Sequence, residues 1–330
     1  QAVSEMEPSQ REAFLENACA GGATAFHLAW MGVGSGLYEC VLALGAEKMY
    51  DEDKVKMFRA FSTGIDVENI ESHMKALGDV SKDLKLKIPV DDGGAGAGTN
   101  RSAFMDVYSA FTRYHMSKYG TTQRQIAVVA SKSHNNSVHN PLAQYTFPLT
   151  VEEVMADREV VWPLTRAMCA PIGDGAAAAI LCSEGFLKKH MSGRAVKILA
   201  SVLQSGNRSK ETDIASRSAK LAYEKAGIGP KDVDVAEVHD ATAYAELYLT
   251  EQMGFCGEGE GGPLAESGAT GLGGRIPVNT SGGLVSRGHP IGASGLAMIY
   301  EMVTQLRGEA GGRQVENARI ALVNNGGGTI

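Results

Sequence analysis

Cys19 and His289 carry the side chains needed for nucleophilic catalysis by a thiol. Cys19 lies in the segment ENACAGGA, directly before an apolar run, and His289 lies in GHPIGASG near the other end of the chain. A thiolate at the first turn of a helix is stabilised by unpaired backbone N–H groups and by the helix dipole, and a nearby imidazole can accept the thiol proton. We therefore expect a nucleophile held as its anion, provided that the fold brings the two segments together.

The composition excludes several classes of function. The 330 residues are 44% hydrophobic and 21% charged, which is enough for a large buried core and two domains. A net charge of −7 argues against a general nucleic-acid or anionic-membrane surface. The five cysteines form no CxxC pair, no secretory signal opens the chain, and no apolar stretch is long enough to span a membrane. We expect a soluble cytoplasmic protein with no metal in this chain.

The apolar pattern predicts alternating helices and strands, as in an α/β fold. Residues 22–33 are apolar nearly all round, which predicts a helix buried on every face, and the run at 39–45 is typical of a central parallel strand. A turn at 170–175 leads into a second buried run. The remaining predictions are strands at 195–203, 233–238 and 319–323, and helices at 104–118, 215–226, 243–254 and 295–306. His239 and Asn324 then fall at the carboxyl ends of strands, where ligands bind in such folds.

Residues 50–150 differ from this pattern. They combine charged and polar segments with aromatic residues, a glycine-rich tract at 91–98 and the helical spacing of 104–118. The tract lacks the flanking strand and helix of a phosphate loop, so we interpret it as a flexible cover. The whole segment is predicted to be an insertion rather than part of a sheet.

Several motifs in a fixed order carry a resemblance to a known family. They are NACAGG at 17–22, ECVLALGAEKM at 39–49, GDGAAAA at 173–179, EVHDA at 237–241, NTSGG at 279–283 and GHPIGASG at 288–295. With these motifs the chain resembles the thiolase superfamily, and within it the sterol-carrier-protein-type thiolases. The resemblance implies two βαβαβαββ halves in a five-layer αβαβα sandwich with an inserted loop domain, usually in a homodimer.

The resemblance also divides the chain. Residues 1–50 and 151–190 would form the N-terminal half, 51–150 the loop domain over the coenzyme A channel, and 191–330 the C-terminal half. Members of the family carry a further β-α-β stretch ahead of the cysteine segment, and we expect that the printed sequence omits it.

The resemblance implies roles for three side chains. Cys19 would attack the carbonyl carbon of an acyl-CoA or 3-oxoacyl-CoA and form an acyl-cysteine. His289 would hydrogen-bond the sulfur, and His239 would donate to the thioester oxygen as negative charge develops there. Coenzyme A would be a co-substrate.

The chain departs from the family at the second acid/base. Thiolases place a second cysteine before a C-terminal glycine run or directly after the His-Asp pair, and here those positions hold Asn324 and Ala241. Neither side chain can carry a proton at neutral pH. Asp240 and Tyr244 are candidate replacements, and Asn324 is a candidate amide donor to the substrate. The missing thiol favours an unusual substrate: a steroid side chain, an aromatic or a dicarboxylic acyl group.

Four further residues are candidates for binding coenzyme A. His134 and His139 lie in a segment that resembles a family loop near the coenzyme, although a role in loop architecture is the simpler interpretation. Ser281 and Gly282 lie in the NTSGG motif.

The sequence thus predicts an acyltransferase that cleaves a 3-oxoacyl-CoA with coenzyme A. One alternative is a retro-aldol lyase that acts with a small partner containing a zinc ribbon and an OB fold, although such relatives tend to lose the nucleophile, which is retained here. Another is a non-catalytic acyl-CoA or sterol binder, disfavoured because Cys19, His239 and His289 are all present.

Overall fold

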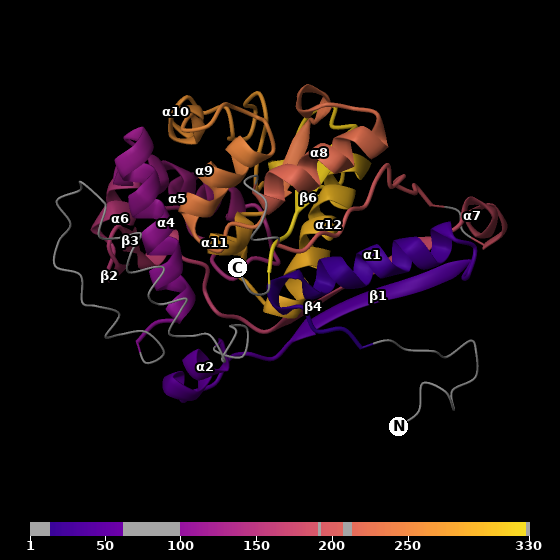
Figure 1. Cartoon of the computed structure of the whole chain (residues 1–330), viewed down its shortest axis with the longest axis horizontal. Helices are drawn as coiled ribbons and strands as arrows, with labels where there is room; N and C mark the ends of the chain where they lie inside the picture. Colours follow the sequence, from indigo (N-terminus) through magenta and orange to yellow (C-terminus); the bar gives the residue numbers. More distant parts are fainter. Residues whose placement is uncertain (1–13, 62–99, 191–192, 207–212, 328–330) are drawn as a thin grey trace.

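The computed structural model describes residues 14–61, 100–190, 193–206 and 213–327 (Figure 1). The glycine-rich tract predicted to be a cover, 91–98, lies outside these residues. The described helices are α1 (Gly21–Gly34), α2 (Lys54–Ala60), α4 (Ala103–Tyr119), α5 (Gln123–Ser137), α6 (Val151–Ala156), α7 (Glu184–His190), α8 (Ile214–Ala226), α9 (Ala243–Gln252), α10 (Gly261–Glu266), α11 (Gly283–Arg287) and α12 (Ile291–Arg307). The strands are β1 (Cys40–Glu47), β2 (Glu159–Val161), β3 (Leu164–Thr165), β4 (Gly175–Cys182), β5 (Val235–Val238) and β6 (Ala321–Asn324).

These strands form three pairs among the described residues. β1 pairs antiparallel with β4, β2 with β3 antiparallel, and β5 with β6 parallel. Helices α1 and α12 pack against β1 and β4 and against each other, and α12 also contacts β5 and β6. Figure 1 shows α12 between the β1–β4 pair and β6, with α4, α5 and α6 on the other side of the molecule. Helix α12 therefore packs against both the β1–β4 pair and the β5–β6 pair.

The predicted helices at 104–118, 215–226 and 243–254 are confirmed to within a few residues. Side chains at their boundaries explain where two of them start: Ser102 accepts from the N–H of Phe104, and Asp213 accepts from the N–H groups of Ala215 and Ser216. Helix α12 begins at residue 291, four residues earlier than predicted, because the carbonyl of Pro290 already accepts the first helical hydrogen bonds.

Two predictions about burial are wrong. Helix α1 is not buried on every face, since Leu28 is 41% and Met31 is 49% exposed. The strand at 39–45 is antiparallel rather than parallel, and its side chains alternate, with Leu42 and Leu44 exposed and Ala43 buried. Both differences have the same physical reason. Within the described residues, α1 and β1 contact each other and α12, and the side chains that point away from these contacts stay exposed.

The strand predicted at 195–203 is also wrong. Residues 193–206 contain no strand in the part of the chain that the structure describes. Leu199 and Leu203 remain 43% and 46% exposed, whereas Ile198 packs against the cluster that contains Ala29 and Leu181, so this segment touches the core without pairing with a described strand.

Small residues let the start of α12 approach α1 and β1 very closely. A Cβ added at Gly45 would lie 2.3 Å from the carbonyl oxygen of Gly292, and one added at Gly22 would lie 2.8 Å from the same atom. The side chain of Glu47 then accepts a hydrogen bond of 3.0 Å from the N–H of Gly292, where a carboxylate is favoured by the helix dipole. This contact joins the segment around Cys19 to the segment around His289.

We predict that Gly45→Ala destabilises the fold and that Gly34→Ala does not. The new methyl group at 45 would overlap backbone and force β1 away from α12, which costs about 1–3 kcal/mol. Gly34 ends α1 with nothing within 4 Å of an added Cβ, so alanine there should be neutral or stabilising by up to about 1 kcal/mol. Urea unfolding of both variants is the measurement, and equal free energies of unfolding would contradict this packing argument.

Candidate active site

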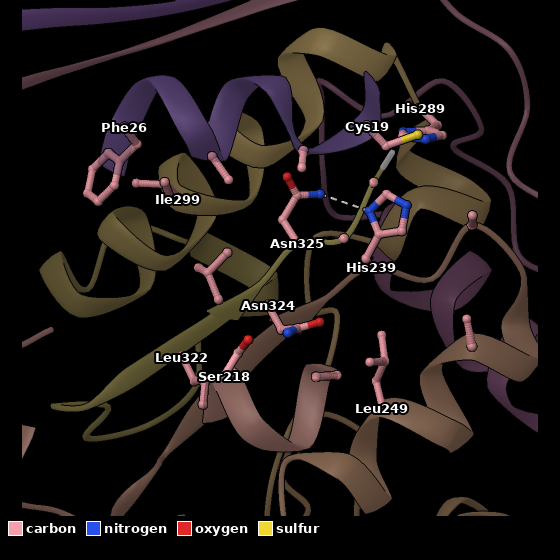
Figure 2. Close-up of a pocket in the computed structure, with 18 of the residues that line it drawn as sticks. Cys19, Phe26, Ser218, His239, Leu249, His289, Ile299, Leu322, Asn324 and Asn325 are labelled. Carbon is pink, nitrogen blue, oxygen red and sulfur yellow. Dashed lines mark hydrogen bonds between the residues drawn. The ribbon is translucent and has the colours of Figure 1, made fainter. Parts of the chain in front are cut away.

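Cys19, His239 and His289 come together in one place, although they are far apart in the sequence. The sulfur of Cys19 and one ring nitrogen of each histidine all lie within 4.8 Å of one another. The two imidazole rings meet edge to face, with centroids 5.1 Å apart and an angle of 78° between their planes (Figure 2). A nucleophile and two imidazoles at this spacing can share a proton and a substrate.

Three different elements position these side chains. Cys19 lies in a 3₁₀ turn, Ala18–Ala20, immediately before α1, and Ala18 adopts a positive φ of 43°. The turn is held by a hydrogen bond from the side chain of Asn17 to Thr24. His239 follows β5, at its carboxyl end as predicted, and His289 precedes the first turn of α12. Both imidazoles are buried, with 7% and 9% exposure.

The hydrogen bonds of Ser294 fix the tautomer of His289. The hydroxyl of Ser294 donates to the carbonyl of Pro290 at 2.9 Å, so its only proton is used. The same oxygen lies 2.7 Å from Nδ1 of His289 and must therefore accept a hydrogen bond from it. Nδ1 carries the proton, which leaves a lone pair on Nε2 of His289.

The hydrogen bond from Asn325 stabilises the other tautomer in His239, with the ring proton on Nε2 instead of Nδ1. The amide Nδ2 of Asn325 donates to Nδ1 of His239 at 2.9 Å, as the dashed line in Figure 2 shows. Nδ1 is then the acceptor, and the ring proton is on Nε2. One imidazole of the pair thus offers a lone pair and the other an N–H.

The sequence interpretation had selected Asn324 and missed Asn325. Figure 2 shows the amide of Asn324 pointing away from His239, on the side of Ser218 and Leu249, while that of Asn325 points to the ring. Successive side chains at a strand end face opposite sides. The signal in the sequence was the pair of asparagines itself, but which of the two faces the histidine depends on the orientation of β6.

Burial sets the protonation of the site. It raises the pKa of the Cys19 thiol to about 11, with a further contribution from Glu47 and Glu16. Burial also lowers the pKa of His239 to about 4 and that of His289 well below its usual value, and the positive charge of Arg287 acts in the same direction. The expectation of a resting thiolate is therefore wrong: desolvation outweighs the stabilising backbone hydrogen bond, and all three groups are neutral at pH 7.

Asp240 and Tyr244 are not directed at the sulfur by any described contact. Asp240 is fully buried, and its Oδ1 accepts the N–H of Leu284 at 2.7 Å; burial raises the pKa of its carboxyl group well above the usual range. Tyr244 lines the cavity next to the site, but its ring packs on His115 and Tyr248, and burial raises its pKa as well.

The four residues expected to bind coenzyme A lie elsewhere, and none lines the cavity. His134 is buried within α5 and stacks on Tyr145, whereas His139 is exposed. Ser281 is buried and bonds to the carboxylate of Glu237 through both its N–H and its hydroxyl. Gly282 has a φ of 104° and leaves no room for a Cβ beside Ser137. Their visible contacts are structural.

A cavity of about 4230 Å³ opens onto Cys19, His239 and His289. It is several times larger than the roughly 300–1,000 Å³ that a small ligand fills. Tyr108 of α4 also lines it; burial raises the pKa of this phenol, with smaller electrostatic contributions from Cys19 and Asp240, so Tyr108 lies near the reacting groups. No signal in the sequence pointed to Tyr108, because it lies in the predicted insertion within an ordinary amphipathic pattern.

Comparison with known proteins identifies the family. Acetyl-CoA acetyltransferase of Methanothermobacter thermautotrophicus is 38% identical over 329 residues, which cover 98% of this chain and 77% of that protein. The chain belongs to the thiolase family. The family model for the thiolase C-terminal domain matches residues 201–330, and the benzoylsuccinyl-CoA thiolase subunit BbsB of Thauera aromatica is 33% identical over 322 residues, 95% of this chain and 76% of that one.

Two further matches concern the length of the chain and its fold. Sterol carrier protein 2 of Bos taurus is 39% identical over 325 residues, 94% of this chain but only 56% of that protein, so the chain spans about half the length of these relatives. A solved Ltp2–ChsH2(DUF35) aldolase has a TM-score of 0.68 at 23% identity, covering 95% of this chain and 76% of that one, which shows a thiolase-like α/β fold. Of the described helices, none is both long and apolar enough to cross a membrane.

The protonation state can be tested by alkylation. With a thiol pKa of about 11, the thiolate fraction of Cys19 rises about tenfold for each pH unit between 7 and 9, and the rate of modification by iodoacetamide should rise with it. The measurement is peptide-level mass spectrometry of Cys19 as a function of pH. A rate that is already at its plateau below pH 8 would show a resting thiolate and contradict the assignment.

Proposed function

We propose that this thiolase is an acyltransferase that cleaves a 3-oxoacyl-CoA with coenzyme A through an acyl-Cys19 intermediate. The observation that carries the proposal is the meeting of one neutral thiol with a lone pair on His289 and an N–H on His239. The relatives named as acetyl-CoA acetyltransferase and benzoylsuccinyl-CoA thiolase support the same class of reaction.

The first half-reaction follows from the two tautomers. Nε2 of His289 accepts the Cys19 proton as the sulfur attacks the 3-oxo carbon of the substrate. The bond between C2 and C3 then breaks, and its electron pair passes into the thioester as an enolate, whose oxygen receives a hydrogen bond from Nε2–H of His239. An acyl group remains on the sulfur, and the enolate must still gain a proton.

His289 can supply that proton, which answers the question raised by the missing second thiol. Burial lowers the pKa of this imidazole well below 6.5, so its protonated form is a strong acid next to the carbanion. The proton taken from Cys19 returns to C2 of the departing acyl-CoA. In the second half-reaction His289 takes the proton of the incoming coenzyme A thiol, which attacks the acyl-cysteine, and delivers it to the released sulfur of Cys19.

The wall of the cavity favours an aromatic acyl group. Its aromatic side chains include Phe26, Trp30, Phe104, Tyr108 and Tyr248. Rings of this kind bind flat apolar groups with large contact areas. Among the substrate classes expected from the sequence, steroid side chain, aromatic and dicarboxylic, an aromatic 3-oxoacyl-CoA is therefore the one we propose.

The larger organisation is also part of the proposal. We assign residues 1–50 and 151–190 to an N-terminal half, 51–150 to an inserted loop domain and 191–330 to a C-terminal half of a five-layer thiolase sandwich that acts as a homodimer. The match of residues 201–330 to the thiolase C-terminal domain supports the last of these boundaries.

A retro-aldol lyase with a small DUF35-type partner is the second candidate. The observation in its favour is the fold similarity to the solved Ltp2–ChsH2(DUF35) aldolase. Retro-aldol cleavage needs no nucleophilic sulfur, whereas here Cys19 is held between two imidazoles. Thiolytic cleavage is therefore the first candidate.

The two candidates differ in their requirement for coenzyme A. We predict that repeated turnover of an aromatic 3-oxoacyl-CoA needs coenzyme A, that incubation without it stops after one cleavage with an acyl adduct on Cys19, and that Cys19→Ala abolishes both. Intact-mass measurement and thioester absorbance follow the two events. Turnover without coenzyme A by native protein and by Cys19→Ala alike would reject the acyltransferase and support the lyase.

Asn325 is predicted to position His239, and its neighbour supplies the matched control. Asn325→Ala removes the donor that keeps the ring proton on Nε2, so kcat should fall by on the order of tenfold, the worth of one hydrogen bond, with little change in KM. Asn324→Ala, whose amide points away, should retain more of the native kcat. Equal losses in the two variants would show that the contact with His239 has no role in turnover.

A further inference from the structure

The three reacting side chains also form a set of metal ligands. A thiol sulfur and two imidazole nitrogens are typical protein ligands of zinc, which binds one cysteine and two histidines, or similar sets, in a tetrahedron. Among the described residues, Cys19, His239 and His289 are the cluster whose possible ligand atoms converge, and these atoms all lie within 4.8 Å of one another. The same convergence that serves acyl transfer thus suits a soft divalent cation.

The distances require only a small contraction. Zinc–sulfur bonds of about 2.3 Å and zinc–nitrogen bonds of about 2.0–2.1 Å place tetrahedral ligand atoms roughly 3.3–3.6 Å apart. The present limit of 4.8 Å exceeds this separation by roughly 1.2–1.5 Å, which side-chain rotation of Cys19 and tilting of the two rings can supply. All three residues line the cavity, so water or a thiol could reach an open fourth position of the tetrahedron.

Outer hydrogen bonds already orient both rings. Metal-bound histidines usually donate their second ring N–H to a neighbouring acceptor, which fixes the ring and strengthens the ligand. Nδ1 of His289 does so to Ser294 at 2.7 Å, so its Nε2 is ready to bind. Nδ1 of His239 faces the amide of Asn325, and rotating that amide would present Oδ1, a buried atom that has no partner as the side chain stands.

We propose that Cys19, His239 and His289 bind one zinc ion, with water in the open fourth position, and that this binding reversibly blocks the nucleophile. Binding converts the thiol to a thiolate and releases its proton to the solvent. His289 binds through the lone pair on its Nε2, whereas the ring proton of His239 first moves from Nε2 to Nδ1, where Oδ1 of the rotated Asn325 amide accepts a hydrogen bond from it. The sulfur lone pairs and the lone pair of His289 are then occupied by the metal, so neither attack nor proton transfer can take place. The inference concerns inhibition of the site and does not depend on which acyl group the site accepts.

The charges around the cluster are compatible with a cation. Glu47 at the end of β1, whose carboxylate accepts the N–H of Gly292, raises the pKa of Cys19 through its negative charge and would favour the added cation for the same reason. Arg287 opposes it, because its guanidinium acts on both histidines.

The experiment compares two identical substitutions. Cys256 is a half-buried thiol between α9 and α10 that belongs to no such cluster of described ligands, so Cys256→Ser is the matched control for Cys19→Ser. Zinc binding is titrated by calorimetry for the native protein and both variants. We expect one site per chain in native protein and in Cys256→Ser, and a loss of affinity of at least about 100-fold in Cys19→Ser, since an alcohol replaces the thiolate ligand.

A cobalt titration of the same three proteins identifies the ligands without any assay of turnover. Native protein and Cys256→Ser should show the thiolate-to-cobalt charge-transfer band and the intense visible bands of tetrahedral cobalt, and Cys19→Ser should lack the first. Zinc should inhibit turnover with the same midpoint as the binding curve, and chelation should restore it. Equal zinc affinities of Cys19→Ser and Cys256→Ser, or a cobalt complex without a thiolate band, would overturn the proposal even if acyl transfer itself is confirmed.

Discussion

The active site depends on the contact between the start of α12 and the segments that carry the nucleophile. Gly292 lies against Gly45 and Gly22 so closely that no side chain fits between the backbones, and Glu47 accepts the N–H of Gly292. Backbone contact of this kind cannot adjust by rotamer changes, so it fixes one distance rather than a range. Because Cys19 precedes α1 and His289 precedes α12, the same contact determines how far the sulfur lies from the ring.

Desolvation then decides what these side chains can do. An exposed thiol next to an exposed histidine could form an ion pair, but burial penalises both charged forms here and keeps the resting site neutral. Charge therefore appears only when a substrate is attacked, which is where a hydrogen-bond donor is most valuable. Ser294 and Asn325 set the tautomers of the two rings. The Ser294 hydroxyl accepts from Nδ1 of His289 and so leaves its Nε2 as an acceptor, whereas the Asn325 amide donates to Nδ1 of His239 and so leaves its Nε2–H as a donor.

The sequence was sufficient for the family, the α/β class, each described helix of ten or more residues except α5, and the three residues that converge. Those features depend on local patterns: caps such as Asp213, apolar periodicity, and motifs that bear the reactive side chains. The sequence was insufficient for features that depend on contacts between distant parts of the chain. Strand direction in β1, the exposed face of α1 and the choice between Asn324 and Asn325 all depend on which element lies opposite, and the protonation of Cys19 depends on burial by segments hundreds of residues away.

The absence of a second thiol at positions 241 and 324 looks like a loss of function when the motifs are read alone. The geometry suggests a different interpretation, because a single buried imidazole of low pKa can take a proton from sulfur and return it to a carbanion within the same site. Such economy has a cost. A thiol and two neutral imidazoles that converge with their Nε2 atoms unengaged cannot distinguish, by geometry alone, a thioester carbonyl from a soft metal ion. The features that make the site competent for acyl transfer are therefore the same features that make it open to inhibition by zinc.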